Sequence, residues 1–149
     1  MMAAHLYNLS VLEPLQKRFS SEFEQAVRDR DLIVDKRSIE FFRAHDMVQT
    51  IYHLMWSKKG YFKDPYNPYS VFWALGLSWW SLVIPMLDRK NNLKPNVTQQ
   101  LIKIIENRYL DLRLDQKEIG EEYFEKARRD ILNFLKYAVT NDQHLNCVL

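Results

Sequence analysis

The sequence predicts an all-α fold, a compact bundle of about five helices around a central apolar helix. Three observations support this prediction. Only three glycines and five prolines interrupt the 149 residues, which favours long helices. Apolar residues recur at intervals of three and four over most of the chain. Hydrophobic residues make up 47% of the sequence, which excludes general disorder. Because the sequence has no internal repeat and no linker-like stretch, we expect a single helical domain over residues 1–149.

The first two predicted helices are amphipathic, with an apolar stripe on one face of each. In the first, residues 10–30, Ser10 and Glu13 have the spacing of a capping box, in which side chains satisfy the free N–H groups of the first turn. The second begins after Asp35, its predicted N-cap, and continues to about Ser57. A glycine shortly after that residue is typical of a helix end.

The third predicted helix, residues 69–88, is the central apolar one. No charged residue occurs from Tyr69 to Leu87, and a stretch of this length is long enough to span a membrane. We nevertheless expect no membrane span, because serine, glycine and proline dilute the hydrophobicity of the stretch. Three tryptophans also lie inside it, whereas membrane proteins place them at the ends of a span. These are Trp73, Trp79 and Trp80.

The remaining elements are a loop and two further helices. Residues 60–68 contain two prolines and are expected to form an ordered loop. A fourth helix is predicted over about residues 95–112. The last helix, residues 116–140, follows Asp115, which has a glutamate three residues later in another capping-box-like pattern.

The sequence carries none of the local patterns of a catalytic or metal site. None of the four histidines has the Glu-x-x-His or His-x-x-x-His spacing that binds metals on helices. There is no glycine-rich phosphate loop and no Gly-x-Ser-x-Gly turn. We therefore expect no catalytic residue, no metal, no cofactor and no enzymatic activity. The single cysteine, Cys147, excludes a disulfide within the chain and predicts a cytoplasmic protein.

Charge is unevenly distributed along the chain. The formal net charge is +2, but residues 36–103 carry ten basic and four acidic side chains, while both ends are net acidic. A basic middle favours a surface that faces a polyanion. On the alternative interpretation, folding intermixes these charges and no such surface forms.

The most informative stretch is residues 56–69, in which lysines alternate with aromatic residues. Lysines neutralise phosphate, and aromatic rings stack on bases for about 1–3 kcal/mol each. A second basic run follows the third predicted helix, which would place it about 30 Å from the first. The candidate nucleic-acid-binding residues are Lys58, Lys59, Tyr61, Lys63 and Tyr66 in the first run and Arg89, Lys90 and Lys94 in the second. Alternatively, the rings of the first run close the core and its lysines keep the loop soluble.

These observations favour a non-catalytic interaction subunit of a larger assembly, such as a ribonucleoprotein, which contacts nucleic-acid backbone through the basic middle segment. The alternative is a regulatory protein that forms a homodimer or docks on another protein through the aromatic-rich residues 61–80, since aromatic residues dominate interface energetics. A protein partner or a homo-oligomer is expected in either case. A third possibility is a small-molecule pocket around Trp56, Trp73 and Trp79.

Overall fold

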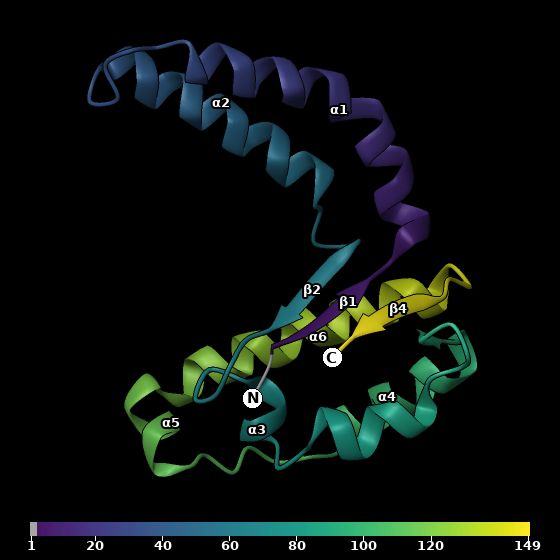
Figure 1. Cartoon of the computed structure of the whole chain (residues 1–149). Coiled ribbons are helices and arrows are strands. Elements are labelled where there is room, and N and C mark those ends of the chain that lie inside the picture. Colours follow the sequence, from purple (N-terminus) through teal and green to yellow (C-terminus); the bar gives the residue numbers. More distant parts are fainter. Residues whose placement is uncertain (1–2) are drawn as a thin grey trace. The chain divides into compact units, whose positions relative to one another are not determined.

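The computed structural model describes residues 3–149 and divides them into two compact units (Figure 1). One unit consists of residues 10–57, and the other of residues 3–9 together with residues 58–149. Helices account for 61% of the described residues, but the second unit contains a four-stranded antiparallel sheet. The prediction of an all-α five-helix bundle is therefore wrong. Within the described residues, every helix is too short or too polar to cross a bilayer, as the sequence predicts.

The first unit is a hairpin of two long helices, α1 (Leu9–Asp31) and α2 (Ile39–Met55). Both helices were predicted, although their N-terminal caps differ from the predicted ones. Helix α1 already begins at Leu9, so Ser10 lies inside it. Ser38, and not Asp35, caps α2, because its hydroxyl accepts a hydrogen bond from the Phe41 N–H at 3.1 Å. The apolar residues between the two helices are Ala26, Val48 and Ile51, which are buried, and Phe19, Phe23, Val27 and Met55, which are partly buried.

The sheet of the second unit has the strand order β2-β1-β4-β3, and all its pairs are antiparallel. The strands are β1 (Ala4–Tyr7), β2 (Tyr61–Asp64), β3 (Asn92–Leu93) and β4 (Leu145–Val148). Side chains of a strand alternate between its two faces. One face, with Leu6, Leu93 and Leu145, belongs to the buried core. We call the opposite face the outer face; its side chains are His5, Tyr7, Tyr61, Lys63, Asn92, Asn146 and Val148.

The predicted central helix does not form. Its residues instead make the short helix α3 (Val71–Ala74), the π-helical turn η1 (Trp79–Val83) and the 3-10 turn η2 (Ile84–Met86). Gly76 interrupts the stretch with a φ of +68°, in the left-handed region that favours glycine. Valine, isoleucine and tryptophan are also weaker helix formers than leucine or alanine. The segment still contributes fully buried side chains to the core, but as irregular chain.

Three further helices complete the core of this unit: α4 (Pro95–Glu106), α5 (Leu114–Ile119) and α6 (Glu121–Thr140). The last predicted helix is thus divided at Gly120, which has a φ of +103°. Helices α4 and α6 pack closely against each other. The core side chains that they contribute are Leu101, Ile102, Ile105, Ile131, Phe134, Leu135 and Ala138. These residues hold α6 beneath the sheet, where its exposed flank reaches the edge strand β2.

Candidate nucleic-acid interface

Three of the predicted lysines line one groove of about 490 Å³ beside the edge strand β2. We call this feature the lysine groove. Lys58 and Lys59 reach it from the turn before the strand, and Lys63 reaches it from the strand itself. Its other lining residues are Tyr61 and Phe62 from β2 and Asp130, Asn133, Phe134 and Tyr137 from α6. Because one acidic residue faces three lysines, the groove is net positive.

The walls of the groove are aromatic. The rings of Phe62 and Phe134 lie 6.1 Å apart between their centroids, and Phe134 is 2% exposed, so these two rings join the groove to the core. The Lys59 ammonium lies 4.9 Å above the centre of the Tyr137 ring, a cation–π contact that holds the charge at the groove. A phosphate in the groove would therefore meet lysines between aromatic walls.

Three rings lie parallel on the outer face, next to the groove. The β1–β2 register places Tyr7 opposite Tyr61 and His5 opposite Lys63. The ring centroids of Tyr7 and Tyr61 are 5.2 Å apart, and those of His5 and Tyr61 are 6.0 Å apart, with interplanar angles of 7° and 4°. His5 Nδ1 and the Tyr61 hydroxyl are 2.8 Å apart and share a hydrogen bond. Tyr61 and Lys63 belong to both the outer face and the groove, so the two features are continuous.

Burial, with a smaller contribution from the charge of Lys63, lowers the pKa of His5 below its ordinary value of 6.5. The His5 ring is therefore neutral near pH 7. A neutral ring can stack on Tyr61 without adding a second positive charge beside Lys63. At this position the outer face offers a flat ring, and Lys63 supplies the charge.

The second basic run lies at the other edge of the sheet, around β3. Arg89 and Lys90 belong to the turn before this strand, and Lys94 follows it. The Asp88 carboxylate accepts hydrogen bonds from the backbone N–H groups of Asn92 and Lys90, at 3.0 and 2.9 Å. The Asn92 N–H lowers the pKa of Asp88, so this carboxylate remains charged and offsets part of the local positive charge.

The sheet, and not a long helix, separates the two basic runs. Since β2 and β3 are the two edges of a four-stranded sheet, three strand spacings of about 4.8 Å, or about 14 Å in total, lie between them. The separation of about 30 Å predicted from the sequence depended on a helix over residues 69–88, and that helix does not form. On the outer face between the runs, the Asn146 amide donates a hydrogen bond to the Asn92 side-chain oxygen at 3.1 Å.

The structure thus brings part of the predicted set together. Lys58, Lys59, Tyr61 and Lys63 share the groove, whereas Arg89, Lys90 and Lys94 lie at the far edge of the sheet. Tyr66 belongs to neither group and is 57% exposed in the loop after β2. Sequence reasoning missed His5, Tyr7, Asn133 and Tyr137. For His5 and Tyr7, the alternation of aliphatic and aromatic side chains over residues 4–7 is a signal, but it extends over only four residues.

The loop after β2 is anchored by a buried carboxylate. Asp64 is 2% exposed and accepts four hydrogen bonds. The donors are the Ser70 hydroxyl at 2.7 Å, the Trp79 indole N–H at 2.7 Å, and the backbone N–H groups of Val71 at 2.8 Å and Phe72 at 3.3 Å. Burial raises the pKa of Asp64, and these hydrogen bonds act against the rise. Asp64 therefore fixes the end of β2, and with it the position of Lys63, from inside the fold.

A second buried polar side chain holds the same loop from the helical side. The Gln116 side-chain nitrogen donates to the backbone oxygens of Pro68 and Ser70, at 2.9 and 3.2 Å. Its side-chain oxygen accepts from the Arg113 N–H at 3.2 Å. Asp64 and Gln116 are both occupied by these bonds. We therefore assign them a structural role and not a ligand-binding one.

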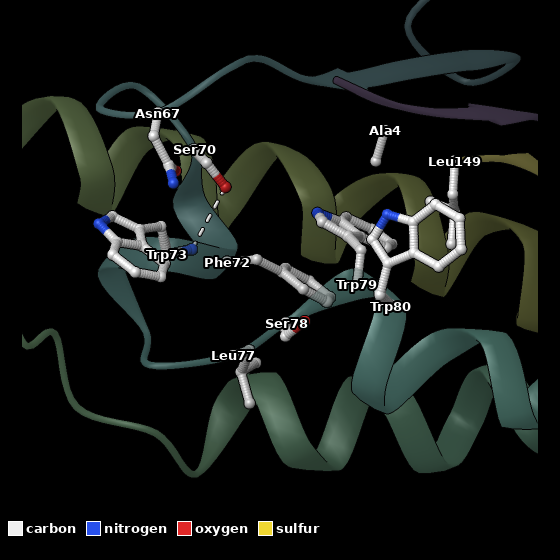
Figure 2. Close-up of a pocket in the computed structure, with 10 residues that line it drawn as sticks. All are labelled: Ala4, Asn67, Ser70, Phe72, Trp73, Leu77, Ser78, Trp79, Trp80 and Leu149. Atoms are coloured by element: carbon white, nitrogen blue, oxygen red, sulfur yellow. Dashed lines mark hydrogen bonds between the residues drawn. The ribbon is translucent and has the colours of Figure 1, made fainter. Parts of the chain in front are cut away.

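A separate cavity of about 70 Å³ is lined by tryptophans. Figure 2 shows the residues around it. Trp73 lies at one end of it beside Asn67, and Trp79 and Trp80 lie at the other, near Leu149. The Trp79 ring stacks on Phe72 with centroids 3.7 Å apart. An apolar cavity that binds benzene has a volume of about 150 Å³, about twice that of this cavity. Trp56 is not among the lining residues, and the cavity carries no argument for a small-molecule site.

The described residues 3–149 hold no cluster of three metal-ligating acidic, histidine or cysteine side chains. Burial raises the pKa of Cys147 to about 12, so its thiol stays protonated and unreactive near pH 7. Compared with family models, curated proteins and solved structures, the chain matches none of them.

Proposed function

We propose that this protein is a non-catalytic subunit of a larger assembly and that it binds single-stranded nucleic acid. The strand enters the lysine groove and crosses the outer face toward the basic turn before β3. The observation that carries this proposal is that Tyr61 and Lys63 join a groove with three lysines to a row of parallel rings. Phosphates and bases of one strand require these two chemistries side by side.

Unpaired bases fit this surface better than a duplex does. Rings on a sheet gain energy by stacking on bases that are not already stacked, as in the RNA-binding domains that use a four-stranded sheet. Every base has a flat face, so stacking tolerates any sequence. We therefore expect binding with a strong salt dependence and a weak sequence preference.

The first test reverses charge in the groove. Lys58→Glu combined with Lys63→Glu should weaken binding to a fluorescent single-stranded oligonucleotide at least about tenfold at low salt, because two phosphate contacts are lost. The slope of log affinity against log salt should become shallower by about 1.4, since each contact contributes about 0.7 for a single strand. Fluorescence anisotropy at several salt concentrations measures both quantities.

The matched control is Lys103→Glu combined with Lys117→Glu. These lysines are exposed on α4 and α5 and change the net charge by the same amount. If the control weakens binding as much as the groove variant, the effect is one of net charge and the proposed site is wrong. If the unmodified protein does not bind at low salt, the proposed function is wrong.

A second test removes a ring without changing charge. Tyr7→Leu keeps an apolar side chain on β1 but deletes the ring that lies parallel to Tyr61. Binding should weaken by about tenfold, in line with about 1–3 kcal/mol per stacked base, and the salt slope should not change. Tyr109→Leu is the control, because Tyr109 is 91% exposed and distant in sequence from the sheet strands. An unchanged affinity of Tyr7→Leu would remove the outer face from the proposal.

Cytoplasmic localisation and a protein partner are also part of this proposal. A single buried thiol suits a reducing compartment.

Trp80 favours a second candidate function. This function is that of a regulatory protein that forms a homodimer or docks on another protein through residues 61–80. Trp80 is 59% exposed and borders two hollows, of about 70 and about 320 Å³. Tryptophan is enriched at the energetically dominant positions of interfaces. If Trp80→Ala leaves self-association unchanged in sedimentation, a homodimer through this segment is excluded.

A further inference from the structure

The lysines of the lysine groove have no carboxylate partner. Among the ion pairs of the described residues, none includes Lys58, Lys59 or Lys63. The acidic residue of the groove, Asp130, already pairs with Lys126 on the same helix, at 2.9 Å between the ammonium nitrogen and a carboxylate oxygen. The positive charge of the three lysines is therefore left for an anion from outside the fold.

Lys58 and Lys59 converge because the chain turns before β2. Successive side chains of an extended strand point to opposite faces, but residues 58–60 form a turn, and both lysines line the groove. The Asn8 N–H donates a hydrogen bond to the Gly60 oxygen at 2.7 Å, which ties the turn to the residue that follows β1. Two adjacent ammonium groups thus face the groove from one anchored turn.

Lys63 has a different place, because its side chain belongs to the groove and to the outer face. It therefore meets the nucleic-acid strand where the strand leaves the groove. The other direction, along α6 toward its N-terminus, is acidic and repels phosphates. There the next hollow is lined by three glutamates and two cations: Glu121, Glu122, Glu125, Lys126 and Arg129, beside Tyr123.

The charge of the turn matches a phosphate at the end of a strand better than one between two nucleotides. A bridging phosphate carries one negative charge. A terminal phosphate carries about 1.5–2 negative charges near pH 7 and has three strong acceptor oxygens. Such an anion can accept charge-assisted hydrogen bonds from both ammonium groups of the turn. The groove volume of about 490 Å³ is also that of a site for one small ligand, about 300–1,000 Å³.

We propose, on the basis of the proposed function, that Lys58 and Lys59 bind the terminal phosphate of a single strand, which may be its 5′ or its 3′ phosphate. Lys63 then meets the next phosphate, and the following bases cross the outer face from Tyr61. The lysine groove is thus the place where the bound strand begins or ends.

Three oligonucleotides of one sequence test this proposal: one with a 5′ phosphate, one with a 3′ phosphate and one with neither. Each has about six nucleotides and no fluorescent label, so that both ends are free and one strand covers one site. In isothermal titration calorimetry at low salt, one phosphorylated form should bind at least about tenfold more tightly than the unphosphorylated form, because of its additional bonds to two ammonium groups. The form that does so identifies the end that the groove takes.

Two variants then locate the terminal phosphate. Lys58→Gln combined with Lys59→Gln should reduce this gain to less than about threefold, because the paired ammonium groups are lost. The matched control, Arg89→Gln combined with Lys90→Gln, removes the same charge from exposed residues at the other edge of the sheet. It should weaken binding of all three oligonucleotides alike and keep the gain. A gain that survives in the first variant, or disappears equally in both, would overturn the proposal.

The unmodified protein separates this proposal from the proposed function. Equal affinities for the three oligonucleotides, or the same gain from either phosphate, would refute the terminal-phosphate site and leave single-strand binding intact. If none of the three bound, the proposed function would be wrong as well.

Discussion

Replacing Asp64 by asparagine should lower the free energy of unfolding by about 3 kcal/mol or more. The carboxylate accepts from Val71 with one oxygen and from Ser70, Phe72 and Trp79 with the other. An amide has one acceptor oxygen, and its NH₂ group would point at donors that are already buried. Each buried donor left without a partner costs about 1–3 kcal/mol. Urea unfolding followed by tryptophan fluorescence measures the loss.

Asp142→Asn is the control for this substitution. Asp142 is exposed and has a φ of +52°, a conformation that asparagine tolerates well. Its unfolding free energy should change by no more than about 0.5 kcal/mol. A similarly small change for Asp64→Asn would show that the four hydrogen bonds do not hold the loop as described.

The stability of the unmodified protein and that of Asp64→Asn should also depend differently on pH. Burial raises the pKa of Asp64 above its ordinary value of 3.8, so the folded protein holds this proton more tightly than the unfolded chain. The resulting stabilisation is complete below the ordinary value and is lost as the pH rises through the raised pKa. Asp64→Asn lacks this contribution. The stability difference between the two proteins should therefore narrow with rising pH in that window and stay constant above it.

Replacing Phe134 by alanine should cost about 3–5 kcal/mol, the usual range for deleting a fully buried phenylalanine ring. Phe134 is 2% exposed and packs on Phe62, so its loss leaves a cavity beneath the edge strand. Binding of a single-stranded oligonucleotide should weaken as well, because the groove loses the ring that supports its wall. Thermal and urea unfolding measure the first effect, and anisotropy measures the second.

Asn133→Ala separates the loss of stability from the loss of oligonucleotide binding, since Asn133 is exposed and lines the same groove. It should leave the unfolding free energy within about 0.5 kcal/mol of the original. If Phe134→Ala also remained within that range, the assignment of Phe134 to the core would be wrong.

The sequence predicted the long amphipathic helices because their periodicity is local. Helices α1, α2 and α6 bury one stripe each, and such a stripe is visible in any window of about eleven residues. The strands have two to four residues each, and their partners lie far away in the chain. No local signal identifies pairs such as His5 with Val148. The sheet was therefore missed, and with it the fold class.

The difference between local and long-range signals also explains which part of the candidate site could be predicted from the sequence. Lys58, Lys59 and Lys63 are close in sequence, so their grouping was predictable. The addition of His5 and Tyr7 was not, because it depends on a strand pair that spans the whole inserted hairpin. The predicted third helix failed because the chain leaves helical geometry after the single turn of α3, where Gly76 has a φ of +68°.

The pairing of β1 with β4 also determines when the protein can finish folding. These are the two central strands, and their partners join residues 5–7 to residues 146–148. During synthesis the hairpin of α1 and α2 can form on the ribosome as soon as it emerges, since its contacts are local. The sheet cannot close until residues 145–148 have left the exit tunnel. Until then β1 exposes an unpaired strand edge, the kind of surface on which nascent chains recruit chaperones or aggregate.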